Sequence, residues 1–196
     1  MTKIYNSEQT GRSMVEMLGV LAIVGVLSIG GISGYSKAMS KYKINKTIDQ
    51  VSLLITSIRT AFGNQNSYAG LTTQKAIDYD FVGNDLTLGS TNTLTNAYSG
   101  TVTIEARTST GAACTGNYCP AFAVTYANLE RQACAVIASS DWGGSAASGL
   151  YSITINTTKH TWGGTSGLPI SYTTAISECT GTAGKYTTTS IEWVYY

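Results

Sequence analysis

The sequence contains little charge and a single histidine. Only 12% of its 196 residues are charged, about half the usual share for a globular domain, and the net charge is +1. Nucleic acid is therefore not predicted as a partner, because a domain that neutralises phosphates is strongly basic. We interpret His160 as an ordinary surface side chain, and one histidine leaves little material for acid–base or metal chemistry. No cofactor and no enzymatic activity are predicted.

What the chain has instead is 21 glycines and 13 tyrosines, together with many serines and threonines. A polar but uncharged surface of this kind is typical of extracellular or sheet-forming proteins. The length suits one domain with a sizeable core.

The apolar residues are concentrated near the N-terminus. Residues 14–32, MVEMLGVLAIVGVLSIGGI, form an apolar run that only Glu16 interrupts. A helix of about 20 residues crosses the hydrocarbon core of a bilayer, so this segment is a candidate membrane span. It is not a conventional cleaved signal, because the run is long for the apolar region of a signal peptide. A short polar leader, MTKIYNSEQTG, precedes it and ends at Gly11.

The helical pattern continues beyond the span, but on one face only. The apolar positions recur at spacings of three and four: Ile44, Ile48, Val51, Ile55, Ile58 and Phe62. This is the stripe of an amphipathic helix, with Gln50 among the residues expected on the surface. Gly63 and Asn64 give a stop signal. The pattern predicts one helix of roughly fifty residues.

Alternating patterns indicate strands in the remainder of the chain. The apolar members are Val102, Ile104 and Ala106; Phe122 and Val124; Tyr151, Ile153 and Ile155; and Ile191, Trp193 and Tyr195. One short helix is expected where Leu129, Ala133, Val136 and Ile137 share a face, with Asn128 as its N-cap. The predicted fold class is α+β: a long N-terminal helix packed on an antiparallel sheet head.

All four cysteines lie in this head: Cys114, Cys119, Cys134 and Cys179. An even count in a chain with a membrane or export segment favours disulfides. A zinc site is the alternative, although the spacing is not that of a zinc finger. Three pairings are possible. We favour Cys114–Cys119 with Cys134–Cys179, because the turn at residues 115–117 already holds the first pair close.

The N-terminal motif resembles a known processing site. GRSMVE, residues 11–16, is similar to the prepilin-peptidase site of type IV pilins, in which cleavage follows the glycine and a glutamate is fifth in the mature chain. Glu16 is fifth from Arg12. YAGLTT at residues 68–73, LTNAYSG at residues 94–100, and a helical Cys134 with a partner, Cys179, near the C-terminus resemble the type IVb branch.

The resemblance implies a structural subunit of a pilus filament, and the implied role of the filament is adhesion, another surface function or DNA transfer. It implies a leader at residues 1–11, an assembly and transmembrane helix at 12–63, and a globular head at 64–196 with a disulfide-bounded C-terminal region. The implied partners are further copies of the chain in a helical homopolymer, a prepilin peptidase and the inner-membrane pilus assembly machinery. The implied location is the bacterial inner membrane for the precursor and an extracellular filament after assembly. Two departures are Arg12, where the family usually has phenylalanine or methionine at the N-methylated position, and the lack of proline in residues 14–40.

Glu16 carries the predicted assembly role. A carboxylate in an apolar helix seeks a positive partner, and cleavage after Gly11 would create one, the α-amine of Arg12. Two other readings stay open. A minor pilin or a type II secretion pseudopilin would share the same N-terminal chemistry. A membrane-tethered sugar-binding domain or enzyme is the alternative from another class, but we interpret Trp142, Trp162 and Trp193 as core or loop anchors rather than a sugar platform.

Overall fold

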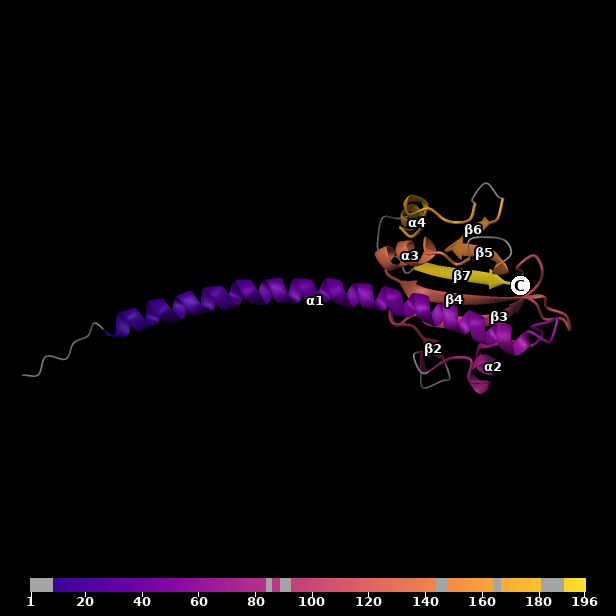
Figure 1. Ribbon diagram of the computed structural model, residues 1–196, viewed down its shortest axis with the longest axis horizontal. Helices are drawn as coiled ribbons and strands as arrows, with labels where there is room; N and C mark the ends of the chain where they lie inside the picture. The colour runs from indigo at the N-terminus through magenta and orange to yellow at the C-terminus, as the bar shows by residue number, and fades with distance from the viewer. Residues whose placement is uncertain (1–8, 84–85, 89–92, 144–147, 164–166, 181–188) are drawn as a thin grey trace, which may run out of the picture. The chain divides into compact units, whose positions relative to one another are not determined.

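The computed structural model describes residues 9–83, 86–88, 93–143, 148–163, 167–180 and 189–196, with side chains described from Met14 onward except at residues 87–88. Figure 1 gives the order of the elements. The chain forms two compact units, Met1–Tyr42 and Lys43–Tyr196. The boundary falls within the first helix, α1 (Gln9–Phe62), so the two units are described in turn.

The first unit consists of the N-terminal part of α1. The helix continues without a break through the apolar run, as predicted. Of the described helices, α1 alone has the length and apolar composition to cross a membrane. The hydroxyl of Ser28 donates a hydrogen bond to the Val24 carbonyl at 2.7 Å. This bond satisfies the hydroxyl within the helix and leaves the surface of the segment apolar.

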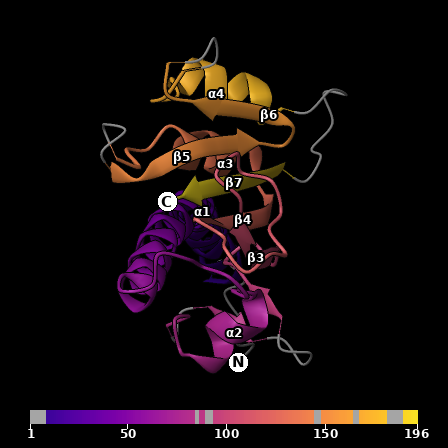
Figure 2. The ribbon, with the colours of Figure 1, turned by 90° about the vertical axis from the view of Figure 1, so that its right-hand side faces the viewer.

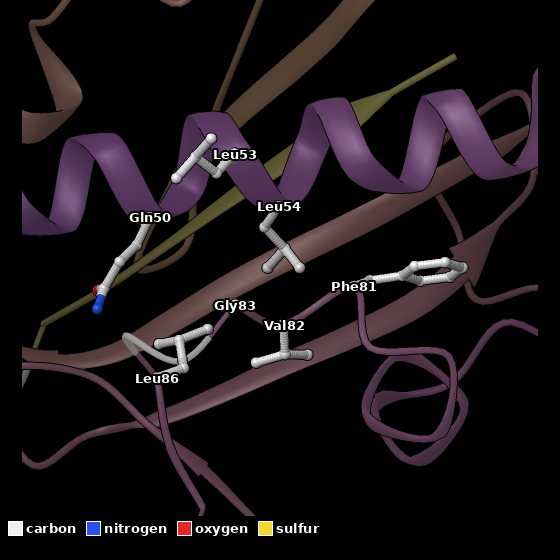
Figure 3. Close-up of a pocket in the computed structure, with 7 residues that line it drawn as sticks. All are labelled: Gln50, Leu53, Leu54, Phe81, Val82, Gly83 and Leu86. Carbon is white, nitrogen blue, oxygen red and sulfur yellow. The ribbon is translucent and has the colours of Figure 1, made fainter.

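The second unit begins with the C-terminal part of α1, whose predicted stripe forms one wall of the core. Ile44, Val51, Ile55 and Ile58 are buried, and Ile48 and Phe62 are partly buried against the same cluster. Gln50 is also buried, so its predicted place on the surface is wrong. Figure 3 shows Gln50 and Leu54 on the side of α1 that faces Phe81, Val82 and Leu86, which line the same pocket.

The head contains a seven-stranded antiparallel sheet in the described residues, in the order β1-β2-β3-β4-β7-β5-β6. The strands are β1 (Thr87–Leu88), β2 (Leu94–Thr95), β3 (Thr101–Arg107), β4 (Ala121–Leu129), β5 (Leu150–Ile155), β6 (Thr158–Thr161) and β7 (Thr189–Tyr195). The last strand thus inserts between β4 and β5, which places the C-terminal segment at the centre of the sheet.

The predicted alternation holds along most of these strands. Ile153, Ile191 and Trp193 point into the main core, as the period of two requires. Tyr151 is the exception, because the register of β5 against β7 shifts between Leu150 and Ser152. A shift of this kind turns the side chain to the other face. Tyr151 there packs against a small cluster formed by Ala121, Ala123 and Val194.

The described residues of the head also contain three short helices: α2 (Thr73–Asp78), α3 (Arg131–Ala138) and α4 (Tyr172–Glu178). Both views place α2 near β3 and α4 at the opposite end of the head, beside α3 and β6 (Figures 1 and 2). The helix expected around Ala133 is confirmed as α3. Its predicted N-cap is wrong, because Asn128 still belongs to β4 at a positive φ of 58° and donates from its amide to the Tyr98 carbonyl.

Aromatic side chains fill the centre of the head core. Trp193 is fully buried, and its ring centroid lies 4.9 Å from that of Trp142 and 5.9 Å from that of Tyr126. The indole N–H of Trp142 donates to the Ile137 carbonyl at 2.7 Å. Trp162 packs at the edge of the same cluster. The interpretation of the tryptophans as core and loop anchors is therefore confirmed.

Candidate assembly helix and disulfide-tied head

The apolar surface of α1 is the most unusual feature of the first unit. Its large apolar side chains between Met14 and Ile32 are 51–72% exposed. Glu16 is the only charged residue between Met14 and Ser36, and its side chain is exposed as well. Monomeric soluble proteins rarely expose a contiguous apolar surface of this extent. This segment therefore has the surface of a helix that packs in a bilayer or against other apolar helices.

Five glycines flatten this helix surface: Gly19, Gly25, Gly30, Gly31 and Gly34. A Cβ atom added at any of them would meet nothing within 4 Å. Small residues of this kind let the backbones of two helices approach closely in an apolar environment. The helix thus combines apolar area, open contact points and one carboxylate, which are the parts that a helix-packing interface uses.

The structure describes the processing motif only in part. Gly11 and Arg12 lie in the first turns of α1, which begins at Gln9. Residues 1–8 of the leader and the side chain of Arg12 lie outside the described residues. Cleavage after Gly11 therefore stays a prediction, as does the pairing of Glu16 with a new α-amine.

Two disulfides tie the head together. Cys134 in α3 is bonded to Cys179 at the end of α4, with Cα atoms 6.0 Å apart. Cys114 is bonded to Cys119 in the loop between β3 and β4, with Cα atoms 5.9 Å apart. These are the favoured pairings. All four sulfurs are used, so none is left as a thiolate for the alternative zinc site, and no group of three candidate ligands lies together in the described parts.

His160 occupies a buried position that the sequence interpretation missed. Its side chain is 1% exposed on β6, and its Nε2 lies 2.6 Å from Glu178 Oε2 at the end of α4. The surface assignment is therefore wrong, and the reason is strand geometry. His160 is the one buried residue of β6, so its ring points to the side on which α4 packs. No local pattern marks the position, because residues 158–161, TKHT, are all polar.

The same helix end has two more connections. The side-chain amide of Asn156 donates to the Glu178 carbonyl at 3.0 Å, and the next residue, Cys179, forms the long disulfide. The pair formed by His160 and Glu178 is thus one of three ties that fix α4 against the sheet edge and α3. This arrangement is structural, because it completes the packing contact between β6 and α4.

The buried tyrosines are also structural. Burial raises the pKa of Tyr195 to about 12, and its hydroxyl donates to the Trp142 carbonyl at 2.9 Å. Burial, reinforced by the charge of Glu130, raises the pKa of Tyr98 to about 12. Such groups keep their protons at neutral pH. They hold loops against the core and offer no acid or base for catalysis.

An exposed apolar helix joined to a disulfide-tied antiparallel head defines a class of helix-anchored subunits with α+β heads. Residues 41–192 match the family model described as PilS N terminal. The chain belongs to the type IVb pilin family, whose members are structural, non-enzymatic subunits of pili. This confirms the resemblance read from the sequence.

Two solved structures share the fold. A type IV b pilin from Salmonella typhi is 23% identical with a TM-score of 0.52, over 76% of this chain and 95% of that chain. TcpA, a type IV pilin from Vibrio cholerae El Tor biotype, is 13% identical with a TM-score of 0.51, over 79% of this chain and 99% of that one. No curated protein matches the sequence.

Proposed function

We propose that this pilin is the main structural subunit of a type IVb pilus, held in the inner membrane as a precursor, cleaved after Gly11 and polymerised through α1. The observation that carries the proposal is the exposed apolar surface between Met14 and Ile32. Such a surface is stable only in lipid or among other apolar helices. A subunit that lies in lipid as a precursor and among other apolar helices in the polymer accounts for this exposed surface without any other partner.

Glu16 gives this polymerisation its axial register. Cleavage after Gly11 leaves a positive α-amine on Arg12, four residues before the carboxylate. Within a bundle of helices, the amine of one subunit can approach Glu16 of another, and the low dielectric there strengthens the attraction. Burying two charges is costly, so the pair contributes more to specificity than to affinity. The charges of an incoming subunit are therefore paired at one axial offset only.

The partners of the precursor follow from this route. A prepilin peptidase removes residues 1–11 on the cytoplasmic side, and the inner-membrane assembly machinery delivers the subunit to the growing filament. The finished filament supports adhesion or surface or DNA-transfer roles. A minor pilin or a type II secretion pseudopilin would follow the same route at low abundance. The abundance of the chain in the filament therefore distinguishes a main subunit from these alternatives.

The test combines processing with assembly. Intact-mass analysis of membranes and of sheared surface filaments should find a chain that begins at Arg12 in both fractions. In the sheared filaments, this chain should also be the most abundant protein. Gly11→Leu should block cleavage and filament formation. Gly19→Leu is the matched control for cleavage alone, because it puts the same side chain into the same helix and leaves the cleavage site intact, so this chain should still begin at Arg12. A mature chain that begins beyond residue 32 would overturn the proposal, since the assembly helix would be lost.

A further inference from the structure

A second pattern follows the apolar run on α1. Tyr35, Lys37, Lys41 and Tyr42 lie within eight residues, and all four side chains are exposed. No acidic residue occurs between Met17 and Ile48, whereas four lysines do. Of these, Lys43 lies over the Tyr98 ring at 5.5 Å and Lys46 also has an interaction. Lys37 and Lys41 are therefore the two lysines that we consider for binding a partner outside the chain.

The distance along the helix places this cluster at a bilayer interface. From Met14 to Tyr35 an α-helix rises roughly 32 Å, which matches the hydrocarbon core of about 30 Å. With Met14 at one boundary of the core, Tyr35 lies at the other. Lys37 and Lys41 then lie roughly 3 and 9 Å beyond Tyr35, at the depth of the lipid phosphates.

The two residue types also lie on different faces of the helix. Tyr35 and Tyr42 are seven residues apart and share one face, whereas Lys37 and Lys41 are four residues apart and share another face. Tyrosine rings are amphipathic and favour the interface, where one end is apolar and the other is wet. Lysine stems lie along apolar surface while the ammonium group reaches the headgroups. The cluster therefore presents an interfacial residue on each side of the helix.

We propose that Tyr35, Lys37, Lys41 and Tyr42 form an interfacial anchor in which the two lysines bind the phosphates of anionic phospholipid headgroups on the far side of the membrane from the leader. The proposal rests on the membrane role in the proposed function and adds the lipid class that α1 selects. Charge complementarity carries it, because the patch contains two exposed ammonium groups and no neighbouring carboxylate in the sequence. Each lysine near an anionic surface strengthens binding by about fivefold.

The anchor has a consequence for assembly. A subunit that leaves the bilayer for a filament must release these headgroups, so the anionic lipid content of the membrane opposes extraction. The anchor also fixes the depth of the helix, and with it the height of Glu16 in the bilayer. Subunits waiting in the membrane would thus present their carboxylates at one level.

The experiment uses the full chain reconstituted in phosphatidylcholine vesicles that contain a trace of spin-labelled lipid. The measurement is the relative association of spin-labelled phosphatidylglycerol over spin-labelled phosphatidylcholine. We expect a preference of several-fold for the wild type, which falls close to one in Lys37→Gln/Lys41→Gln and in 1 M salt, where charges are screened. The matched control is Lys75→Gln/Arg131→Gln, which removes the same charge from exposed sites in the head and should keep the preference.

The outcomes separate this proposal from the membrane role itself. Protein that fails to float with the vesicles would overturn both. Protein that floats but shows no preference, or keeps its preference in Lys37→Gln/Lys41→Gln, would overturn the anchor alone. If that variant keeps the preference and loses filaments, the lysines bind carboxylates of another copy of the chain instead. Tyr35→Leu/Tyr42→Leu should leave the lipid preference within twofold of the wild type, because the charge is unchanged.

Discussion

The two parts of α1 contain the same types of apolar residue in opposite environments. Ile29 is 72% exposed, whereas Ile58 is fully buried. What differs is the pattern around them. The segment at residues 14–32 is apolar around the whole helix apart from Glu16 and Ser28, and its large apolar side chains are exposed. The stripe that begins at Ile44 is apolar on one face only, and the sheet of the head covers it. The pattern therefore indicates whether a helix packs within its own chain or outside it.

This contrast separates assembly from stability, and the largest effect should come from Glu16. We expect Glu16→Ala to reduce filament yield by more than tenfold, since the incoming helix loses the charge pair that sets its register. Membrane level, cleavage after Gly11 and the melting temperature of the head should not change. Electron microscopy, intact mass and circular dichroism measure these separately, with Glu16→Asp as the conservative control. Normal filaments from Glu16→Ala would defeat the mechanism, and loss of the protein would indicate a role in insertion or folding.

Within the head, the two disulfides should differ in their contribution to stability. The bridge between Cys134 and Cys179 closes 45 residues and that between Cys114 and Cys119 closes 5. On chain entropy alone, they contribute about 4 and about 2 kcal/mol. The double variant Cys134→Ala/Cys179→Ala should therefore lower the free energy of unfolding more than Cys114→Ala/Cys119→Ala. Chemical denaturation of both in mild detergent checks the order, and equal losses would show that packing rather than loop length decides.

A matched pair of isoleucines tests the contrast directly. Ile58→Ala removes a fully buried side chain and should lower the free energy of unfolding by about 2–5 kcal/mol. Ile29→Ala makes the same change on the same helix in the exposed segment, and should leave the unfolding of the head within about 0.5 kcal/mol of the wild type. Denaturation in detergent measures both. A large loss from Ile29→Ala would mean that the N-terminal segment packs on the head in solution.

The sequence was sufficient wherever the structural signal was local. The length of α1, its buried stripe, most strand alternation and the Cys114–Cys119 pair follow from spacings of a few residues. The helices α2 and α4 were missed because six or seven residues are too few for a helical period. Their capping residues, Thr72 and Ser171, accept hydrogen bonds from Lys75 and Thr174, and would have been the available signal.

The errors concern side chains whose surroundings come from distant segments. Gln50 is buried and lines a pocket with Phe81, Val82 and Leu86, and His160 pairs with Glu178, eighteen positions away. Neither partner lies within reach of a local pattern. The insertion of β7 between β4 and β5 is non-local in the same way. The candidate site differs, because the motif at residues 11–16 is contiguous in the sequence, while the proposed partner of Glu16 belongs to another subunit.

The smallest effect should appear in alkaline solution and only in the head. Tyr98 and Tyr195 have a pKa of about 12 in the folded protein, against 10.0 for an exposed tyrosine, chiefly because burial disfavours the phenolate. The unfolded chain therefore loses these protons first as the pH rises. Their contribution to stability is complete below pH 10 and is lost between about pH 10 and 12.

We accordingly expect the free energy of unfolding to fall gradually over this range. Tyr195→Phe should flatten the fall, although it also removes the hydrogen bond to the Trp142 carbonyl and so lowers stability at pH 7 by about 1 kcal/mol. Tyr172→Phe is the control, because that side chain is exposed and should leave the profile unchanged. Denaturation at pH 7, 10 and 11 measures all three chains. The helical signal of the exposed N-terminal segment has no buried tyrosine to lose, so it should persist after the head has unfolded. Simultaneous loss of both signals would show that the two regions of α1 are coupled more closely than their burial indicates.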